Sequence, residues 1–211
     1  MRHSKGIFES KPESNRSKIV LFTVDPIVDK VKSAYKIVRD FIEKYFREDK
    51  IEVELVPVKV EDFEGLVSDI KSKISTELPK HDTVVVNLTG GMRVLVLATF
   101  TALLFIPKSL INGKNLIIEV EREDGDNVIN ISPEVILVSR LVDRLTNEKL
   151  RIIKALLELG EADAQTLSEM FKLDVSTVRR HLDGLEELGL IEITRGKPMR
   201  ARAKPICKLL I

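Results

Sequence analysis

The sequence predicts an α/β protein in which a domain built on a parallel sheet is followed by a smaller, mainly helical domain. Over residues 18–132, β-branched runs alternate with amphipathic helical runs, a spacing typical of strand–helix units with right-handed crossovers. The alternation stops after Pro133. At 211 residues the chain is long enough for two domains, each with its own core.

The first strand–helix unit starts at residue 18. The run KIVLFTV (18–24) predicts a buried strand, closed by a turn at Asp25-Pro26. The helix predicted next has one apolar stripe at intervals of three and four residues, which we expect to face a core. That stripe consists of Val31, Ala34, Tyr35, Val38, Phe41, Ile42 and Tyr45.

Four more predicted strands continue the pattern. IEVELVPV (51–58) precedes a helix for which Asp62 is the expected N-cap, and DTVVVNL (82–88) leads into a nearly wholly apolar helix ending near Pro107. NLIIEVE (115–121) and the short run NVINI (127–131) are predicted strands joined by the turn EDGD. Ligands of such sheets bind beyond the carboxyl ends of the strands, which directs attention to the loops at 23–26 and 89–93.

Composition excludes several classes of protein. Lys and Arg number 34 against 33 Asp and Glu, so any nucleic-acid surface must be local. The single cysteine, Cys207, excludes an intramolecular disulfide framework and argues against a zinc cluster. Residues 1–17 are polar and predict a flexible tail, and the most apolar stretch, Val94–Pro107, is shorter than the roughly 20 residues of a bilayer span. We therefore expect a cytoplasmic protein without membrane contact.

The second domain, over residues 147–211, has the pattern of three helices and a hairpin. The first helix, about Asn147 to Leu159, ends at Gly160, a suitable C-cap, and AQTLSEMF predicts a short second helix with Leu167 and Met170 buried. The third helix, VSTVRRHLDGLEEL, is followed by short β-like pieces around LIEIT and AKPICKLL. Between the domains, residues 133–146 predict an amphipathic linker helix.

The exposed face of the third helix carries side chains suited to DNA. Ser and Thr near a helix N-terminus can contact phosphates or base edges, and Arg can pair bidentately with guanine. The candidates are Ser176, Thr177, Arg179 and Arg180.

The hairpin after the third helix is basic. From Ile193 through Lys208 there are six basic and no acidic residues, as phosphate contact by a wing requires. The candidates there are Arg195, Lys197, Arg200 and Arg202. The region resembles the winged helix-turn-helix superfamily of bacterial and archaeal regulators, with STVRRHLDGLEELGLIE as its most family-like string. The alternative is a packing or dimerisation module with a solvated charge run.

The segment NLTGGMR follows a predicted strand and opens a helix. Gly90 and Gly91 let the backbone turn tightly and approach a ligand closely. Free amides at the N-terminus of the helix favour an anion, and Arg93 adds a phosphate partner. The alternative is an ordinary strand-to-helix turn.

Established catalytic and nucleotide motifs are missing from the sequence. G-x-G-x-x-G and G-x-x-x-x-G-K-S/T do not occur, three His are scattered, and no nucleophile lies beside an evident base. We expect no catalytic residues, no metal and no cofactor.

Together, KIVLFTVDP, VVVNLTGGMR and the winged helix resemble the CRISPR-associated CARF-domain transcriptional regulators of archaea with type I-A systems. The resemblance covers nearly the whole chain from residue 18. It implies a Rossmann-like CARF domain that forms a homodimer, binds a cyclic oligoadenylate such as cyclic tetra-adenylate across the two-fold axis, and adjusts paired winged helices on promoter double-stranded DNA, in antiviral defence. The ligand residues that it implies are Thr23, Val24, Asp25, Pro26, Asn87, Thr89, Gly90, Gly91, Met92 and Arg93.

Two positions depart from the pattern of the family. Many members have Thr or Ser where this chain has Met92, and a Gly-containing turn where it has Asp25-Pro26. Two other functions stay open from the sequence: a ring nuclease that cleaves the cyclic ligand with Arg93, Thr89 and Asp25, and a constitutive architectural DNA-binding protein without an effector.

Overall fold

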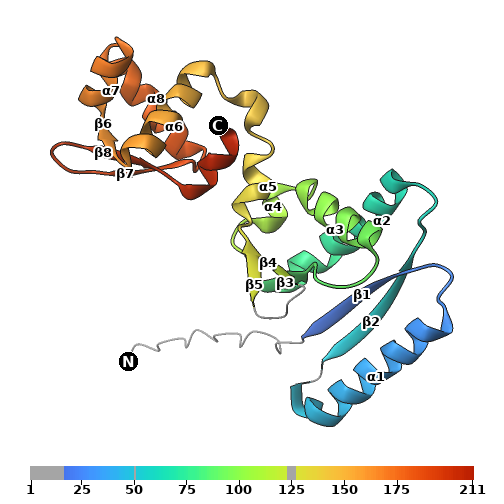
Figure 1. Cartoon of the computed structure of the whole chain (residues 1–211). Helices are drawn as coiled ribbons and strands as arrows, with labels where there is room; N and C mark the ends of the chain where they lie inside the picture. Colours follow the sequence, from blue (N-terminus) through green and yellow to red (C-terminus); the bar gives the residue numbers. More distant parts are fainter. Residues whose placement is uncertain (1–16, 50, 123–126) are drawn as a thin grey trace, which may run out of the picture.

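The protein consists of a three-layered α/β domain and a smaller winged-helix domain joined by a short helix (Figure 1). The computed structural model describes residues 17–49, 51–122 and 127–211. The predicted turn EDGD and all but the last residue of the predicted tail lie outside these ranges. In chain order, the first domain contains β1 (Lys18–Val24), α1 (Asp29–Tyr45), η1 (Arg47–Asp49), β2 (Glu52–Val58), α2 (Phe63–Glu77), η2 (Leu78–Lys80), β3 (Thr83–Asn87), α3 (Arg93–Leu104), α4 (Lys108–Ile111), β4 (Asn115–Glu121) and β5 (Val128–Ile131).

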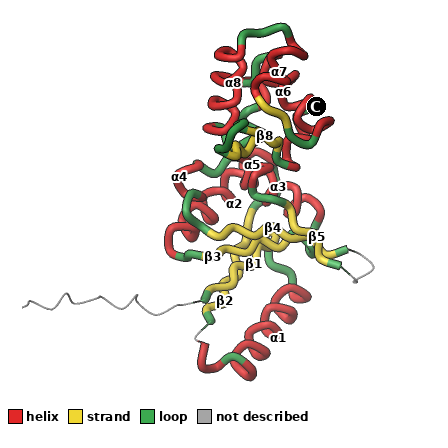
Figure 2. Tube along the Cα trace, turned by 90° about the vertical axis from the view of Figure 1, so that its left-hand side faces the viewer, coloured by secondary structure: helices red, strands yellow, loops and turns green. Residues whose placement is uncertain are grey.

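The strands form the middle layer, with α1 on one side and α2 and α3 on the other (Figure 2). β1 pairs in parallel with β2, from Lys18 opposite Glu52 to Val24 opposite Val58. β3 pairs in parallel with β4, and β5 closes that sheet in antiparallel orientation. The predicted α/β class with parallel strands is confirmed. In the described part of the chain the backbone ladders form two groups, the pair β1-β2 and the three-stranded sheet β3-β4-β5, and no ladder joins β1 to β3.

Helix packing unites the two sheets where a backbone ladder does not. Leu95 and Ala98 of α3 lie in one apolar cluster with Val58 of β2 and with residues of α2. Leu103 of the same helix lies in a second cluster with Ile118 of β4. α3 therefore contributes to both cores.

α1 departs from the sequence-based expectation that its stripe faces a core. None of its residues, all of them described, is buried. Tyr35 is half-buried and its hydroxyl donates to the Val53 carbonyl at 2.8 Å, but Phe41 and Tyr45 are 52% and 61% exposed. The amphipathic pattern predicted the helix correctly, but only part of its apolar stripe lies against β2.

The second domain contains α6 (Asn147–Leu159), β6 (Ala162–Asp163), α7 (Ala164–Phe171), α8 (Val175–Glu187), β7 (Ile191–Thr194), β8 (Arg200–Ala203) and η4 (Pro205–Leu210). β6, which the sequence did not predict, joins the wing hairpin in a sheet of order β6-β8-β7. α6 ends at Gly160, whose φ of 80° is accessible to glycine. Met170, predicted to be buried, is 49% exposed. Of the run AKPICKLL only Ala203 is in a strand, as the last residue of β8, and Pro205–Leu210 form η4.

The sequence predicted one helix for the linker, but the structure shows two separate elements. The linker consists of α5 (Glu134–Val138) and a separate 3₁₀ turn, η3 (Val142–Arg144). Ile136 is fully buried in the cluster of β4 and α3, whereas Val138 is buried in the cluster of the winged helix. α5 therefore belongs to the cores of both domains.

Candidate ligand and DNA-binding sites

The first candidate site is the glycine loop, which we define as Asn87 to Arg93. The Asn87 side chain forms two hydrogen bonds at the start of this loop. Its Oδ1 accepts from the Thr89 amide at 2.9 Å, and its Nδ2 donates to Glu119 Oε1 at 3.0 Å. Thr89 Oγ1 accepts from the Glu121 amide at 2.7 Å. The end of β4 thus holds this loop in place, a role of Glu119 and Glu121 that the sequence did not reveal.

The two glycines of the glycine loop differ in what requires them. Gly91 has a φ of 100°, which disfavours any other residue. Gly90 has no positive φ, and a Cβ added there would meet no atom within 4 Å. The described structure alone therefore does not require glycine at position 90, whereas close approach of a ligand backbone would.

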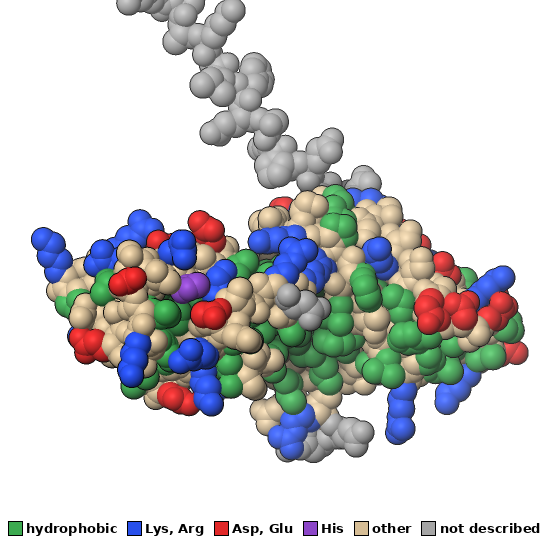
Figure 3. Space-filling view, turned by 90° about the horizontal axis from the view of Figure 1, so that it is seen from above, with side chains coloured by type: hydrophobic (Ala, Val, Ile, Leu, Met, Phe, Trp, Pro, Cys, Tyr) green, Lys and Arg blue, Asp and Glu red, His purple; other side chains and the backbone are tan. Residues whose placement is uncertain are grey.

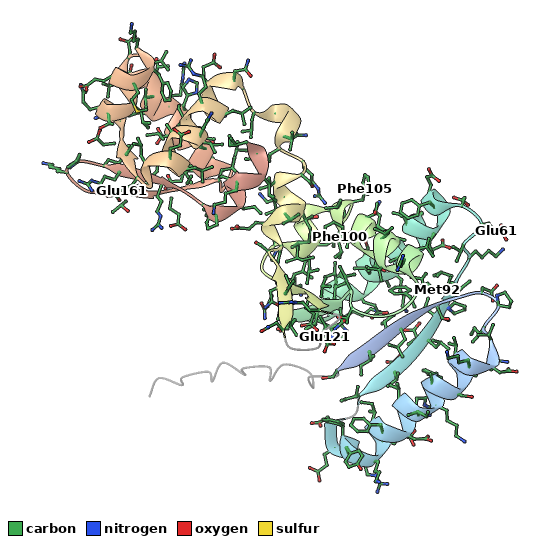
Figure 4. All side chains as sticks on the ribbon, viewed as in Figure 1. Glu61, Met92, Phe100, Phe105, Glu121 and Glu161 are labelled. Carbon is green, nitrogen blue, oxygen red and sulfur yellow. The ribbon has the colours of Figure 1, made fainter. Side chains whose placement is uncertain are left out.

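α3 begins directly behind the glycine loop. Its N-cap, Met92, makes no side-chain capping bond in the described structure, so the first amides of the helix stay available to an anion. Arg93 is exposed and forms no ion pair or hydrogen bond with any described residue. Met92 is 54% exposed and lies at the end of α3 nearest to β1 (Figure 4). The loop thus presents amides, a cation and an apolar side chain together.

The loop after β1 lies beside the first turn of α3. Val24 and Val94 pack into the same apolar cluster, and the Asp25 amide donates to the Val58 carbonyl at 2.9 Å. Thr23 is only 7% exposed, whereas Asp25 and Pro26 are exposed. Of the residues predicted in this loop, only these last two present their side chains freely to solvent.

The second candidate site is the predicted DNA-binding surface of the winged helix. Asp163 caps α7 by accepting from the Thr166 amide at 2.8 Å, and that bond lowers the pKa of its carboxyl. The turn to α8 passes through Lys172, at a φ of 55°, and Ser168 Oγ donates to the Leu173 carbonyl at 2.6 Å. These contacts fix α8, whose face toward the core carries the fully buried Val178, Leu182 and Leu185.

The predicted DNA-binding cations fall into two groups. Arg179, Arg180, Lys197 and Arg202 are exposed and form no ion pair with any described residue. Arg200 pairs with Glu161, and Arg195 Nη2 lies 3.7 Å from Glu186 Oε2. Ser176 is exposed and Thr177 half-buried at the start of α8. Lys and Arg side chains project from the winged-helix end of the molecule, at the left of Figure 3.

Metal clusters and membrane-spanning helices were sought among the described residues. In the ranges that the structure describes, no cluster of His, Cys, Asp and Glu is arranged to hold a metal ion. No helix in those ranges combines the length and the apolarity needed to cross a membrane.

Comparison with known proteins assigns both domains. Residues 7–132 match the family model described as the Csa3 CRISPR-associated Rossmann-like domain. Residues 146–192 match the model of the arsR family of bacterial regulatory proteins, a helix-turn-helix family. The search of curated proteins finds no match.

Among solved structures, the chain is similar to Can2 from Sulfobacillus thermosulfidooxidans in complex with cyclic tetra-adenylate. The sequences are 12% identical and the TM-score is 0.34. The alignment covers 92% of this chain and 55% of that one, so the chain spans about half the length of Can2.

Proposed function

The chain belongs to the family of the Csa3 CRISPR-associated Rossmann-like domain, and we propose that it is a ligand-responsive transcriptional regulator of CRISPR-associated genes. One observation carries the proposal. An open glycine loop precedes the helix that runs toward the winged DNA-binding domain, and its Arg93 pairs with none of the residues that the structure describes. In this proposal an anion binds at the loop and changes how the winged helix binds DNA.

The ligand that we propose is a cyclic oligoadenylate, with cyclic tetra-adenylate as the expected form. Its phosphates suit the free amides of α3 and the guanidinium of Arg93. Its adenines suit an exposed apolar side chain such as Met92, 54% exposed. Asp25 repels phosphate, so we place it toward ribose or base. The family and the chemistry of the loop support this ligand together.

We further propose that two copies form the ligand pocket together. Leu97, Thr101 and Phe105 follow Arg93 at intervals of four residues, and thus form one row along α3. Leu97 and Phe105 are 61% and 63% exposed. A symmetric contact along this row covers apolar side chains that water now reaches and brings two Arg93 residues toward one axis.

The neighbouring groove supports a two-fold contact. A cavity of about 280 Å³ lies between α2 and α3, lined by Phe63, Glu64, Val67, Ser68, Lys71, Thr101 and Phe105. Glu64 and Lys71 lie at equal distances along the chain from the midpoint between Val67 and Ser68. Two antiparallel copies of α2 crossing at that midpoint place Glu64 of one copy opposite Lys71 of the other, which is the self-complementarity of a two-fold interface.

Analytical ultracentrifugation tests this surface. Phe105→Asp should shift the protein from dimer to monomer, because it places a carboxylate in an apolar contact. Phe41→Asp, which changes an exposed aromatic residue of α1, is the matched control. A dimer that survives Phe105→Asp and dissociates with Phe41→Asp would place the interface on α1.

Calorimetric titration with cyclic tetra-adenylate tests the ligand. We expect one ligand per two chains, and Arg93→Ala should weaken binding about 10- to 100-fold, as is typical for loss of a charge-assisted contact. Lys108→Ala, an exposed cation beyond the other end of α3, should not change binding. No heat and no shift in melting with the wild-type protein would reject this ligand.

Gly90→Ala gives a sharper test of the glycine loop. Because the added Cβ meets no atom of the described residues within 4 Å, the melting temperature should stay unchanged while ligand affinity falls. Unchanged affinity would show that no part of the ligand approaches the backbone at position 90 closely. Prolonged incubation of the protein with cyclic tetra-adenylate separates the two alternative functions. Recovery of linear oligoadenylate would favour a ring nuclease. Recovery of intact ligand, together with DNA binding that the ligand does not alter, would favour a constitutive DNA-binding protein.

A further inference from the structure

The side chain of Arg140 caps the C-terminal end of α3, which is the end opposite the glycine loop. It follows α5, and the residue is half-buried. Nε and Nη2 donate to the Leu104 carbonyl at 3.0 and 2.6 Å, and Nη2 also donates to the Ile106 carbonyl at 2.5 Å. Carbonyls at a helix C-terminus lack partners within the helix and form its negative end. One cation therefore fixes the last turn of α3 to the segment that enters the winged helix.

The same segment is fixed to the winged helix by separate contacts. Glu134, the first residue of α5, accepts a hydrogen bond and ion pair from Lys204 at 3.1 Å, directly after wing strand β8. Val138, the last residue of α5, is buried in the core of the winged helix. Displacement of α5 must therefore move the base of the wing or break these contacts.

α3 links the two sets of contacts physically. It has 12 residues and spans about 18 Å at 1.5 Å per residue. Its first turn carries Arg93 of the glycine loop, and its last residue is Leu104, an acceptor of Arg140. A rigid helix held at both ends converts a shift at one end into a shift at the other.

We infer that Arg140 is the positioning residue that couples the state of the glycine loop to the orientation of the winged helix. This inference rests on the proposed function, and it adds a residue that touches neither ligand nor DNA. Linkage requires the coupling to act in both directions, so DNA must also influence the glycine loop through Arg140.

A merely structural role for Arg140 predicts a different result. Loss of a stabilising contact lowers the melting temperature and leaves unchanged the ratio of DNA affinities with and without ligand. A coupling role changes that ratio even where each separate affinity is retained. The ratio is therefore the measurement that decides.

The experiment measures DNA affinity by fluorescence anisotropy at fixed salt, with and without saturating cyclic tetra-adenylate. The probe is a duplex that the wild-type protein selects from a random pool. Coupling free energies in proteins change affinity about 5- to 150-fold, and we expect a wild-type ratio in this range. Arg140→Ala should bring the ratio close to one, while its calorimetric affinity for the nucleotide stays near that of the wild type.

Two variants sharpen this comparison. Arg140→Lys retains the charge but not the planar fork that reaches two carbonyls, so its ratio should lie between those of the wild type and Arg140→Ala. Arg144→Ala removes an exposed arginine from the same linker and should retain the wild-type ratio. A wild-type ratio in Arg140→Ala, or an equal loss in Arg144→Ala, would overturn the inference.

A second readout needs no nucleotide. Hydrogen exchange should show that DNA slows exchange in the first turn of α3 in the wild type and not in Arg140→Ala. If the wild type does not bind cyclic tetra-adenylate but shows this protection, the proposed ligand fails and the coupling stands. If DNA leaves exchange in α3 unchanged in the wild type, the coupling is overturned.

Discussion

The two ends of the molecule are stabilised by different forces. In the winged helix, α6 and α8 bury large side chains completely, among them Ile152, Ile153 and Leu182. At the other end, α1 buries none, and Lys18 of β1 contacts Glu52 at 3.0 Å and Glu54 at 2.6 Å. The comparison shows that apolar burial dominates in the winged helix, whereas ion pairs supplement a smaller apolar cluster in holding the N-terminal strands.

The ion pairs at the N-terminal end form one network. Lys18 and Lys73 both contact Glu54 and Glu77, at distances of 2.6 to 3.3 Å, and Lys80 contacts Glu77 at 3.2 Å. Burial raises the pKa of Glu77, but hydrogen bonds from Lys73, Lys80 and Lys18 outweigh it and lower the pKa to about 2. The contact with Glu54 is the main cause that raises the pKa of Lys18. The network ties β1 and β2 to α2.

The largest expected effect compares one core residue with one exposed residue. Leu182→Ala should lower the free energy of unfolding by about 2 to 5 kcal/mol, because it leaves a cavity in a closed core. Phe41→Ala, at a side chain 52% exposed, should cost less than about 1 kcal/mol. Urea unfolding of both variants measures the difference. Equal losses would mean that another surface covers α1 in solution.

A second prediction compares free and paired cations of the winged helix. Arg179→Ala should weaken DNA binding about 10- to 100-fold, which corresponds to loss of a base or phosphate contact. Arg200→Ala should weaken it less, because Arg200 must first leave Glu161.

The carboxylate of that pair provides the control. Glu161 lies on the wing side of the domain (Figure 4), and Glu161→Gln should tighten DNA binding by releasing Arg200 and removing a negative charge. Anisotropy titrations at one salt concentration measure all three variants. Weaker binding by Glu161→Gln would show that the pair orients Arg200 for DNA.

The smallest expected effect concerns the ion network. Glu77→Gln should cost about 1 kcal/mol at neutral pH, since partly exposed ion pairs contribute little. The folded-state pKa of Glu77 lies below its ordinary value of 4.5, so its contribution is present above pH 4.5 and is lost as the pH falls toward about 2. The variant should lack this part of the acid dependence, measured by urea unfolding between pH 2 and 7.

A surface ion pair is the control for that series. Glu43→Gln removes the pair of Arg39 and Glu43, 3.1 Å apart on exposed α1, and should cost less than about 0.5 kcal/mol. If it costs as much as Glu77→Gln, the network has no advantage over an isolated pair.

Local patterns predicted most of the elements. β1 and β4 have the bounds that their β-branched runs indicated, and α7 coincides with AQTLSEMF. Asp62 caps α2 as expected, by accepting from the Gly65 amide at 2.5 Å. Strand runs and caps depend on neighbouring residues, so one sequence is enough to place them.

Contacts between distant residues could not be predicted. An apolar stripe indicates that α1 is a helix but not what covers it, and Phe41 is exposed. β6 has only two residues, too few for a period. Glu119 is 32 residues from Asn87 and Arg140 is 36 from Leu104, so neither contact has a local signal. The sequence predicted that the glycine loop precedes α3, but it did not predict which side chains hold the loop in place.

The sharing of α5 between two cores determines how this protein can be re-engineered. Ile136 lies in the core of the α/β domain and Val138 lies in the core of the winged helix, only two residues apart. A chimera cut before α5 leaves a hole under α3, and one cut after it exposes an apolar side chain where the new module begins. If the α/β domain is joined to another output domain, α5 must therefore be transferred with it, and the recipient domain must offer a surface that accepts Val138.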